Sequence, residues 1–262
     1  MNIIVCIKQV PNTQEVRIDP KTGSLIREGV PSIINPEDKN AIEEAVLLKE
    51  KHGGRVTVIS MGPAQAEEAL REALAMGADK AILLNDRNFR GADTSATSYT
   101  LGTAIRRLGD FDLILCGRQA IDGNTAQVGP QLAEFLDLPQ VTYVHKVEVN
   151  GETLRAKRAL EDGYELVETQ LPALLTVTKD LNEPRLPAMA EIMNAYREKE
   201  VTVWTAEDVG ADKDNIGLHG SPTRIRRAHT PELKKGKVEF IEGSPKETAQ
   251  KLLTRLKEKH FI

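Results

Sequence analysis

Short apolar runs alternate with amphipathic stretches over the first 140 residues of the chain. Four near-continuous apolar runs are typical of strands buried on both faces of a parallel sheet; they cover residues 3–7, 56–61, 81–84 and 113–116. Stretches with helical spacing lie between them, at residues 38–52, 63–77 and 94–109. This alternation predicts a doubly wound α/β fold with a mostly parallel sheet, whose ligand crevice lies at the carboxyl ends of the strands.

Two further patterns predict antiparallel pairing. Residues 16–19 and 24–27 flank Pro20-Lys21-Thr22-Gly23, which indicates a hairpin inserted at the ligand end of the sheet. After Pro139, strand patterns are separated by Asn150-Gly151 and Asp162-Gly163, two dipeptides typical of hairpin turns. These strands are expected at 141–149, 153–159, 164–169 and 173–177, so the sheet should finish with an antiparallel section.

The pattern loosens from about residue 184. A short helix is expected at 189–198, an irregular stretch follows, and an amphipathic helix at 246–259 ends the sequence. About 60 residues with so little core of their own are costly to order in isolation. We therefore divide the chain into a nucleotide-binding α/β domain at 1–200 and an arm at 201–262 that packs on a partner subunit, with partial disorder as the alternative. The irregular stretch carries a basic cluster, either a solvated face or a row of salt bridges to the partner: Arg224, Arg226, Arg227, Lys234, Lys235 and Lys237.

The run Gly117–Pro130 is the most informative stretch of the sequence. It follows the strand at 113–116 and is expected to open into a helix at 125–136. Free backbone N–H groups at such a helix start, with the helix dipole behind them, suit a nucleotide phosphate. The alternative is a polar loop with an ordinary cap.

Other loops converge on the same edge of the predicted sheet. The first strand runs into residues 8–13, and Asn35 with Pro36 starts the first helix as N-cap and first helical residue. Residues 90–96 form another small-residue helix start, capped by Asp93 or Thr94. Two helix starts of this kind suit two phosphate-bearing ligands, or one of them is merely a cap.

Composition excludes several classes of protein. The formal net charge of −4 argues against a nucleic-acid binder. No apolar run approaches the roughly 20 residues of a membrane span, and residues 1–5 lack the basic region of a signal peptide, so a cytoplasmic location is expected.

The side chains offer no catalytic centre of their own. Cys6 and Cys116 lie in strand patterns and are expected to be buried hydrophobic residues, without the C-x-x-C of a redox or metal site. The five histidines lack ligand spacing, and nothing indicates a nucleophilic triad. We expect no catalytic side chain and no metal, so any chemistry comes from a bound cofactor or a partner chain.

Neither G-x-G-x-x-G nor the P-loop motif follows a strand. Instead, the chain resembles the small (beta) subunit of an electron-transfer flavoprotein over residues 1 to about 200. The run 117–130 is similar to the nucleotide-binding motif of that family. Residues 61–65 with 73–79 are similar to its second strand and helix, and residues 171–177 with 181–185 to its signature region.

This resemblance implies a nucleotide-binding fold of the adenine nucleotide alpha hydrolase-like type and a heterodimer. The alpha subunit holds one FAD, and the beta subunit binds a second nucleotide. That nucleotide is a structural AMP in simple members and a second FAD, reached by NADH, in the electron-bifurcating branch. Residues 10–13, 22–38 and 122–130 resemble the bifurcating branch, except that Asn124 stands where an acidic residue is common.

The chemistry of individual residues in this loop agrees with the resemblance. Gly123 permits close backbone approach to a pyrophosphate. Asn124, Thr125 and Gln127 supply donors, and Arg118 pairs with phosphate or hydrogen-bonds a flavin. We assign Asp122 to loop structure, because its charge repels phosphate.

The remaining assignments follow from the family alone. The cofactor-binding set is completed by Gly117, Gln119 and Val128 in the loop, by Cys6, Asn35, Asp38 and Met61 on the adenine and ribose side, and by Asp93, Thr94 and Ser95 toward NADH or flavin. Residues 187–199 resemble the segment that docks an acyl-CoA dehydrogenase, with Met189 as its apolar anchor. The alternative for Met189 is an ordinary core methionine.

The sequence therefore predicts a bifurcating subunit that passes electrons from NADH to ferredoxin or flavodoxin and, through the alpha-subunit FAD, to an acyl-CoA dehydrogenase. The nearer alternative is a non-bifurcating carrier with AMP. An adenine-nucleotide hydrolase or ligase would need an S-G-G-x-D-S-type loop, which residues 8–13 lack. A nucleotide-sensing module without redox work is the third alternative.

Overall fold

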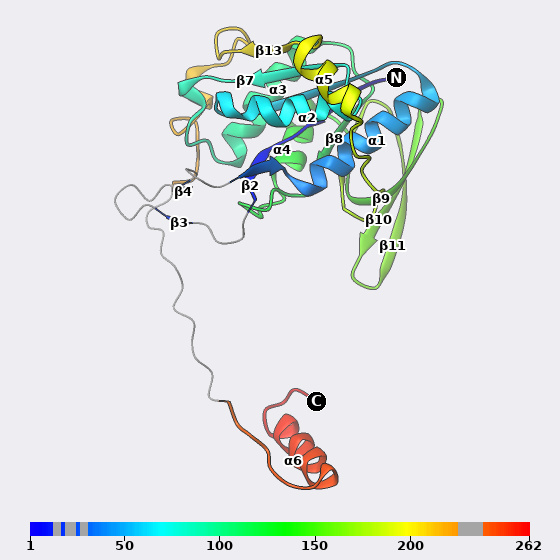
Figure 1. Ribbon diagram of the computed structural model, residues 1–262, viewed down its shortest axis with the longest axis vertical. Coiled ribbons are helices and arrows are strands. Elements are labelled where there is room, and N and C mark those ends of the chain that lie inside the picture. The colour runs from blue at the N-terminus through cyan, green and yellow to red at the C-terminus, as the bar shows by residue number, and fades with distance from the viewer. Residues whose placement is uncertain (13–16, 19–24, 27–30, 225–237) are drawn as a thin grey trace. The chain divides into compact units, whose positions relative to one another are not determined.

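A nine-stranded sheet organises the computed structural model, which describes residues 1–12, 17–18, 25–26, 31–224 and 238–262 (Figure 1). The strand order is β11-β10-β9-β12-β8-β1-β6-β7-β13. The central parallel strands are β1 (Asn2–Cys6), β6 (Arg55–Met61), β7 (Lys80–Leu84) and β8 (Leu113–Gly117). The predicted doubly wound α/β fold is confirmed.

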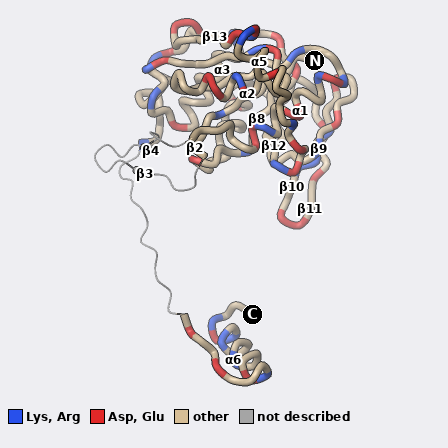
Figure 2. Tube along the Cα trace, viewed as in Figure 1, with Lys and Arg blue, Asp and Glu red and all other residues tan. Residues whose placement is uncertain are grey.

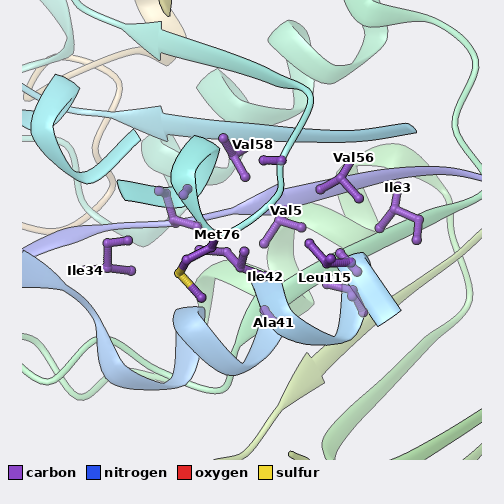
Figure 3. Close-up of a cluster of buried hydrophobic side chains, with 14 of the residues drawn as sticks. Ile3, Val5, Ile34, Ala41, Ile42, Val56, Val58, Met76 and Leu115 are labelled. Atoms are coloured by element: carbon purple, nitrogen blue, oxygen red, sulfur yellow. The ribbon is translucent and has the colours of Figure 1, made fainter. Parts of the chain in front are cut away.

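Helices cover both faces of the sheet. α1 (Pro36–His52) and α2 (Glu67–Ala75) bury their apolar sides with one set of strand side chains, while α3 (Thr94–Leu108) and α4 (Val128–Leu136) pack with the other set. Figure 3 shows Val5 and Leu115, from neighbouring strands, beside Ala41 and Ile42 of α1. Strands buried on both faces must be apolar throughout, which explains their continuous hydrophobic runs.

The far side of the sheet is a long antiparallel meander, as the two turn dipeptides predicted. β9 (Gln140–Asn150), β10 (Thr153–Leu160) and β11 (Gly163–Gln170) pair in succession. The expectation was wrong for β12 (Ala173–Val177), which is parallel to both β8 and β9. The chain returns from the meander to the centre of the sheet, where all five residues of β12 are buried.

Short strands extend the ligand edge. β2 (Gln9–Pro11) pairs with β5 (Ser32–Ile34), and β3 (Arg17–Ile18) pairs with β4 (Leu25–Ile26). The second pair confirms the hairpin expected at this place, although its turn lies outside the described residues.

The last 80 residues contain one strand that the pattern did not predict. After α5 (Met189–Arg197), β13 (Val201–Trp204) pairs in parallel with β7 at the sheet edge. Strand β13 lies within the compact unit Met1–Arg226, and the division of the chain at residue 200 stays a prediction. Four residues with two exposed side chains carry too weak a periodicity to be distinguished from a loop.

The second unit is Arg227–Ile262 and contains α6 (Pro245–Glu258), which begins with a capping box formed by Ser244 and Glu247. Most of the predicted basic cluster lies outside the described residues. Charges of both signs are interspersed along the first unit and along α6 (Figure 2). In the described part of the chain, no helix is long and apolar enough to cross a membrane.

The contact between α3 and α4 yields a stability prediction. A Cβ on Gly102 would collide with the ring of Phe135, which also makes an edge-on contact with Tyr99 at 5.2 Å between centroids. Gly102→Ala should therefore lower the free energy of unfolding by about 1–3 kcal/mol through overpacking, despite the better helix propensity of alanine. Chemical denaturation measures this, with Gly123→Ala, where a Cβ meets nothing within 4 Å, as the matched control. Equal stability of the two variants would contradict the packing argument.

Candidate functional site

The strand order reverses between β1 and β8, and the candidate site lies at their carboxyl ends. From β1 the chain winds through α1, β6, α2 and β7 on one side, then crosses to β8 on the other. Such a reversal leaves a crevice at the strand ends, because the connections leave toward opposite faces of the sheet. The loops after Cys6 and after Gly117 both emerge there.

A single buried carboxylate joins these two loops. Asp38 Oδ2 accepts the N–H of Lys8 at 2.7 Å, and Oδ1 accepts the N–H of Gly117 at 3.1 Å. A Cβ on Gly117 would collide with this carboxylate, so glycine is required for the close approach. Burial raises the pKa of Asp38 to about 7, although its hydrogen bonds and the charge of Lys8 oppose the shift.

The side chain of Asn35 forms hydrogen bonds with the backbone of the loop after β8. It is the N-cap residue of α1, as predicted, but its side chain makes no capping bond. Instead its amide donates to Asp38 Oδ1 at 3.0 Å and to the carbonyl of Gln119 at 2.9 Å, and its oxygen accepts the N–H of Ile121 at 3.0 Å. Asn35 is fully buried, so these bonds fix the loop backbone.

Two charged residues of the loop after β8, Arg118 and Asp122, form ion pairs. Arg118 pairs with Glu37 at 3.1 Å, and its guanidinium lies 5.7 Å from the ring centroid of Tyr143. Lys8 pairs with Asp122 at 2.7 Å, which gives Asp122 the loop-structure role assigned to it from the sequence. The acidic groups around the crevice are thus either paired or buried.

The loop itself presents free backbone donors. Among the described residues, the N–H groups of Thr125, Ala126 and Gln127 have no protein acceptor. Asn124 and Ala126 have left-handed φ angles of 49° and 53°, a conformation that turns backbone N–H groups into an anion-binding concavity. Gly123, Asn124, Thr125 and Gln127 are exposed. We call residues 123–127 the cradle.

The expected helix start at Thr125 was wrong. α4 begins at Val128, with Gln127 as its N-cap residue, because left-handed residues at 124 and 126 cannot belong to an α-helix. The dipole of α4 still lies directly behind the cradle. The donor set therefore comes from loop backbone in addition to a helix end.

Neighbouring elements pack against the first turn of α4, which follows the cradle. The hydroxyl of Ser98 on α3 donates to the carbonyl of Val128 at 3.0 Å. A Cβ on Gly129 would meet the Thr176 methyl at 2.5 Å, and the hydroxyl of Thr176 accepts the N–H of Tyr143 at 3.2 Å. α3 and the β9–β12 pair thus border the start of α4.

The residues at the start of α3 make more hydrogen bonds within the protein than the sequence indicated. Asp93 is its N-cap and accepts the N–H of Ala96 at 3.0 Å, as well as the N–H and hydroxyl of Thr223 at 2.9 and 2.8 Å. Burial opposes ionisation of Asp93, but these bonds outweigh it and lower its pKa. A ligand role for Asp93, Thr94 and Ser95 stays a prediction.

Three predicted side chains lie on the α3–α4 face of the sheet. Cys6 and Cys116 are free, buried and opposite one another in the β1–β8 register, and Met61 packs against the same cluster. The contact with Cys6, together with burial, raises the pKa of the Cys116 thiol. The interpretation of both cysteines as buried hydrophobic residues is confirmed.

The donor set of the cradle fits a phosphate-bearing nucleotide. Consecutive N–H groups, exposed amide and hydroxyl side chains and a helix dipole all favour an anion. Across the described ranges, no group of three or more His, Cys, Asp and Glu side chains is placed to hold a metal ion. The site is thus a candidate for cofactor binding.

A second exposed feature lies on α5 and the residues before it. Leu186, Met189, Met193 and Tyr196 are 93%, 73%, 43% and 58% exposed. We call these four residues the apolar stripe. Met189 is thus not a core methionine, and the alternative for this residue is excluded. Ala195 and Ile192 face the protein instead.

Sequence reasoning missed how much of this site is scaffolding. The polar atoms of Asn35 and Asp38 bond to one another and to the loops after β1 and β8, and a ligand contact for either residue stays a prediction. The sequence also gave no sign of the pairing of Arg118 with Glu37 or of the place of Tyr143 beside Arg118. The polar residues Asn35, Glu37 and Asp38 at the start of α1 were the available signal, but their partners after β8 are about 80 residues away in the sequence.

Comparison with known proteins identifies the family. The family model described as electron transfer flavoprotein domain matches residues 22–209. The chain is 59% identical to the electron transfer flavoprotein subunit beta of Clostridium acetobutylicum and 60% identical to that of Thermoanaerobacterium thermosaccharolyticum, over the full length of each chain. It is 53% identical, again over the full length of both, to the caffeyl-CoA reductase-Etf complex subunit CarD of Acetobacterium woodii. The chain therefore belongs to the electron transfer flavoprotein family, as a subunit of the beta type.

Proposed function

We propose that this chain binds FAD in the cradle and, with an alpha subunit, bifurcates electrons from NADH. One electron goes to ferredoxin or flavodoxin, and the other passes through the alpha-subunit FAD to an acyl-CoA dehydrogenase. When bound, FAD supplies the hydride and one-electron chemistry that the described side chains lack.

The observation that carries this proposal is the cradle. Free N–H groups at residues 125–127 suit the charge of a pyrophosphate, and Gly123 leaves open space for close approach. Asn124, Thr125 and Gln127 add neutral donors without adding negative charge. Arg118 stands at the mouth of the loop, where its remaining N–H groups suit a ring carbonyl or a phosphate oxygen.

One observation favours FAD over AMP. Gly123, Asn124, Thr125 and Gln127 are small, hydroxyl- or amide-bearing and exposed, which leaves room for more than one phosphate. In addition, a relative with 53% identity over its full length is named as part of a complex with caffeyl-CoA reductase. A redox partner that acts on a CoA ester supports an acyl-CoA dehydrogenase as the acceptor here.

The apolar stripe supports the docking of that acceptor. An exposed row containing two methionines suits an interface that forms and separates, because unbranched thioether side chains adapt to different surfaces. Met189 is the most exposed stripe residue on α5 and is the proposed anchor.

Counting the bound cofactors of the purified heterodimer tests the proposal directly. Acid extraction and chromatography should yield two FAD molecules per heterodimer, and NADH oxidation should require both a ferredoxin or flavodoxin and a dehydrogenase acceptor. One FAD with one AMP would instead support the non-bifurcating alternative.

A charge placed in the cradle should weaken nucleotide binding. Gln127→Glu keeps the size of the side chain but sets a carboxylate beside the free N–H groups, so nucleotide affinity should fall about tenfold, or about 1.4 kcal/mol. Equilibrium dialysis with FAD measures this. The matched control is Gln170→Glu, the same change at an exposed position on β11. Equal affinities for the two variants would exclude residues 123–127 as the phosphate site.

The Asp38 carboxyl should titrate near neutral pH. Its pKa of about 7 lies above the ordinary 3.8, so the fold favours the protonated form. The resulting stability is fully present below pH 3.8 and is lost as the pH rises through 7. Carbon-13 NMR of the carboxyl should show this midpoint, whereas Asp93, with a lowered pKa, should titrate below 3.8. A midpoint of Asp38 below that of Asp93 would contradict the proposed burial effect.

A further inference from the structure

Residues 179–185 are bound side-on to α1 by polar contacts that the proposed cofactor site does not use. The amide of Asn40 donates to the carbonyl of Asn182 at 2.7 Å, and the amide of Asn182 donates back to the carbonyl of Asn40 at 3.1 Å. The Asn182 amide also donates to the buried carboxylate of Glu44 at 3.1 Å. These reciprocal bonds fix the backbone of the segment against the helix.

Arg185 completes this attachment by pairing with two carboxylates that lie about two helical turns apart on α1. Its Nε and Nη2 donate to Glu43 at 2.9 and 3.0 Å, and its backbone N–H donates to the same carboxylate at 3.1 Å. Its Nη1 donates to Glu50 at 2.7 Å. The Glu43 side chain is 7% exposed and the Glu50 side chain 52%, so the clamp has a buried half and a solvent half. Planar guanidinium geometry makes such a two-sided contact specific for arginine.

The apolar stripe begins at the next residue. Leu186 follows Arg185 directly, and Met189 starts α5 three residues later. The other end of α5 is held by Arg71, which donates to the carbonyl of Ala195 at 2.6 Å, and by Lys199, which donates to the carbonyl of Leu74 at 3.0 Å. The apolar stripe therefore lies between two points of attachment. Arg185 attaches its start to α1, and Arg71 and Lys199 attach its end to α2.

The same helix carries the loop of the proposed nucleotide site. The first turn of α1 and its cap bind residues 117–121 through Asn35, Glu37 and Asp38, while Asn40, Glu43 and Glu50 bind residues 179–185. A 17-residue helix is a rigid body on this scale, about 25 Å long at 1.5 Å per residue. α1 thus contacts both the loop that leads to the cradle and the segment that leads to the apolar stripe.

We propose that Arg185 is a positioning residue that sets the apolar stripe on α1 for docking of the electron-accepting dehydrogenase. This inference rests on the proposed docking role of Met189 and goes beyond it. Arg185 acts through the segment it holds, since its own N–H groups are directed to Glu43 and Glu50. Without the contacts of Arg185, the apolar stripe is still exposed but its start is no longer attached to α1. A smaller fraction of encounters with the dehydrogenase then leads to electron transfer.

The test uses the whole heterodimer with its bound cofactors and an acyl-CoA dehydrogenase that the wild-type heterodimer reduces. Arg185→Ala should raise the KM for the dehydrogenase about tenfold while kcat changes less than about twofold. Hydrogen exchange of residues 186–197 should become faster, with no change at residues 117–128. Arg185→Lys should give an intermediate KM, because lysine keeps the charge but not the two-sided geometry.

A matched control removes an arginine elsewhere. Arg155→Ala breaks an exposed ion pair with Glu168 on the meander and should leave KM and hydrogen exchange of the stripe unchanged. If Arg185→Ala fails to retain its flavin, Glu50→Gln decides, since it removes the solvent half of the clamp alone and should raise KM in the same direction.

Met189→Asp separates the two proposals. A raised KM for Met189→Asp with an unchanged KM for both Arg185→Ala and Glu50→Gln would overturn the positioning role and leave docking intact. An unchanged KM for Met189→Asp would show that the stripe does not dock the dehydrogenase, and both proposals would then fail. A raised KM in all three variants, with the Arg155→Ala control unchanged, supports both.

Discussion

The contact between the Asp38 carboxylate and the two strand ends determines the geometry of the whole ligand edge. Each oxygen accepts one backbone N–H, from Lys8 after β1 and from Gly117 after β8. These strands are the pair between which the sheet order reverses. A carboxylate in this place connects the two loops that border the crevice. Because burial raises the pKa of Asp38, this connection depends on whether the carboxyl group is protonated.

The residues that support the loop after β8 differ from those that we propose bind the nucleotide. Asn35, Glu37 and Asp38 direct their polar atoms to the loop after β8, whereas the cradle beyond that loop keeps its N–H groups free. Free donors are costly unless they face water or a ligand, so a loop with left-handed residues and open N–H groups needs firm support. The buried polar start of α1 provides it.

The sequence pattern was sufficient for elements whose local signals agree. The apolar runs at 3–7 and 113–116, the Pro36 helix start and the two hairpin dipeptides were all located correctly, because period and turn chemistry are local properties. The prediction failed where neighbours decide. β12 reads like one more strand of a meander, but it lies between β8 and β9, and β13 forms because the edge of β7 is free to pair.

By itself, the sequence determined the fold class, the edge of the sheet that carries the candidate site, and the family to which the chain belongs. These conclusions follow from the order of the apolar runs and from short motifs, which are local properties of the sequence. Only the tertiary structure decided which polar groups remain free. Asn35 and Thr125 are equally plausible donors in the sequence, yet Asn35 is fully buried and bonded while Thr125 is exposed with its N–H unpaired. Hydrogen-bond partners about 80 residues apart are set by packing, and packing is what separates the supporting residues from those left to bind a ligand.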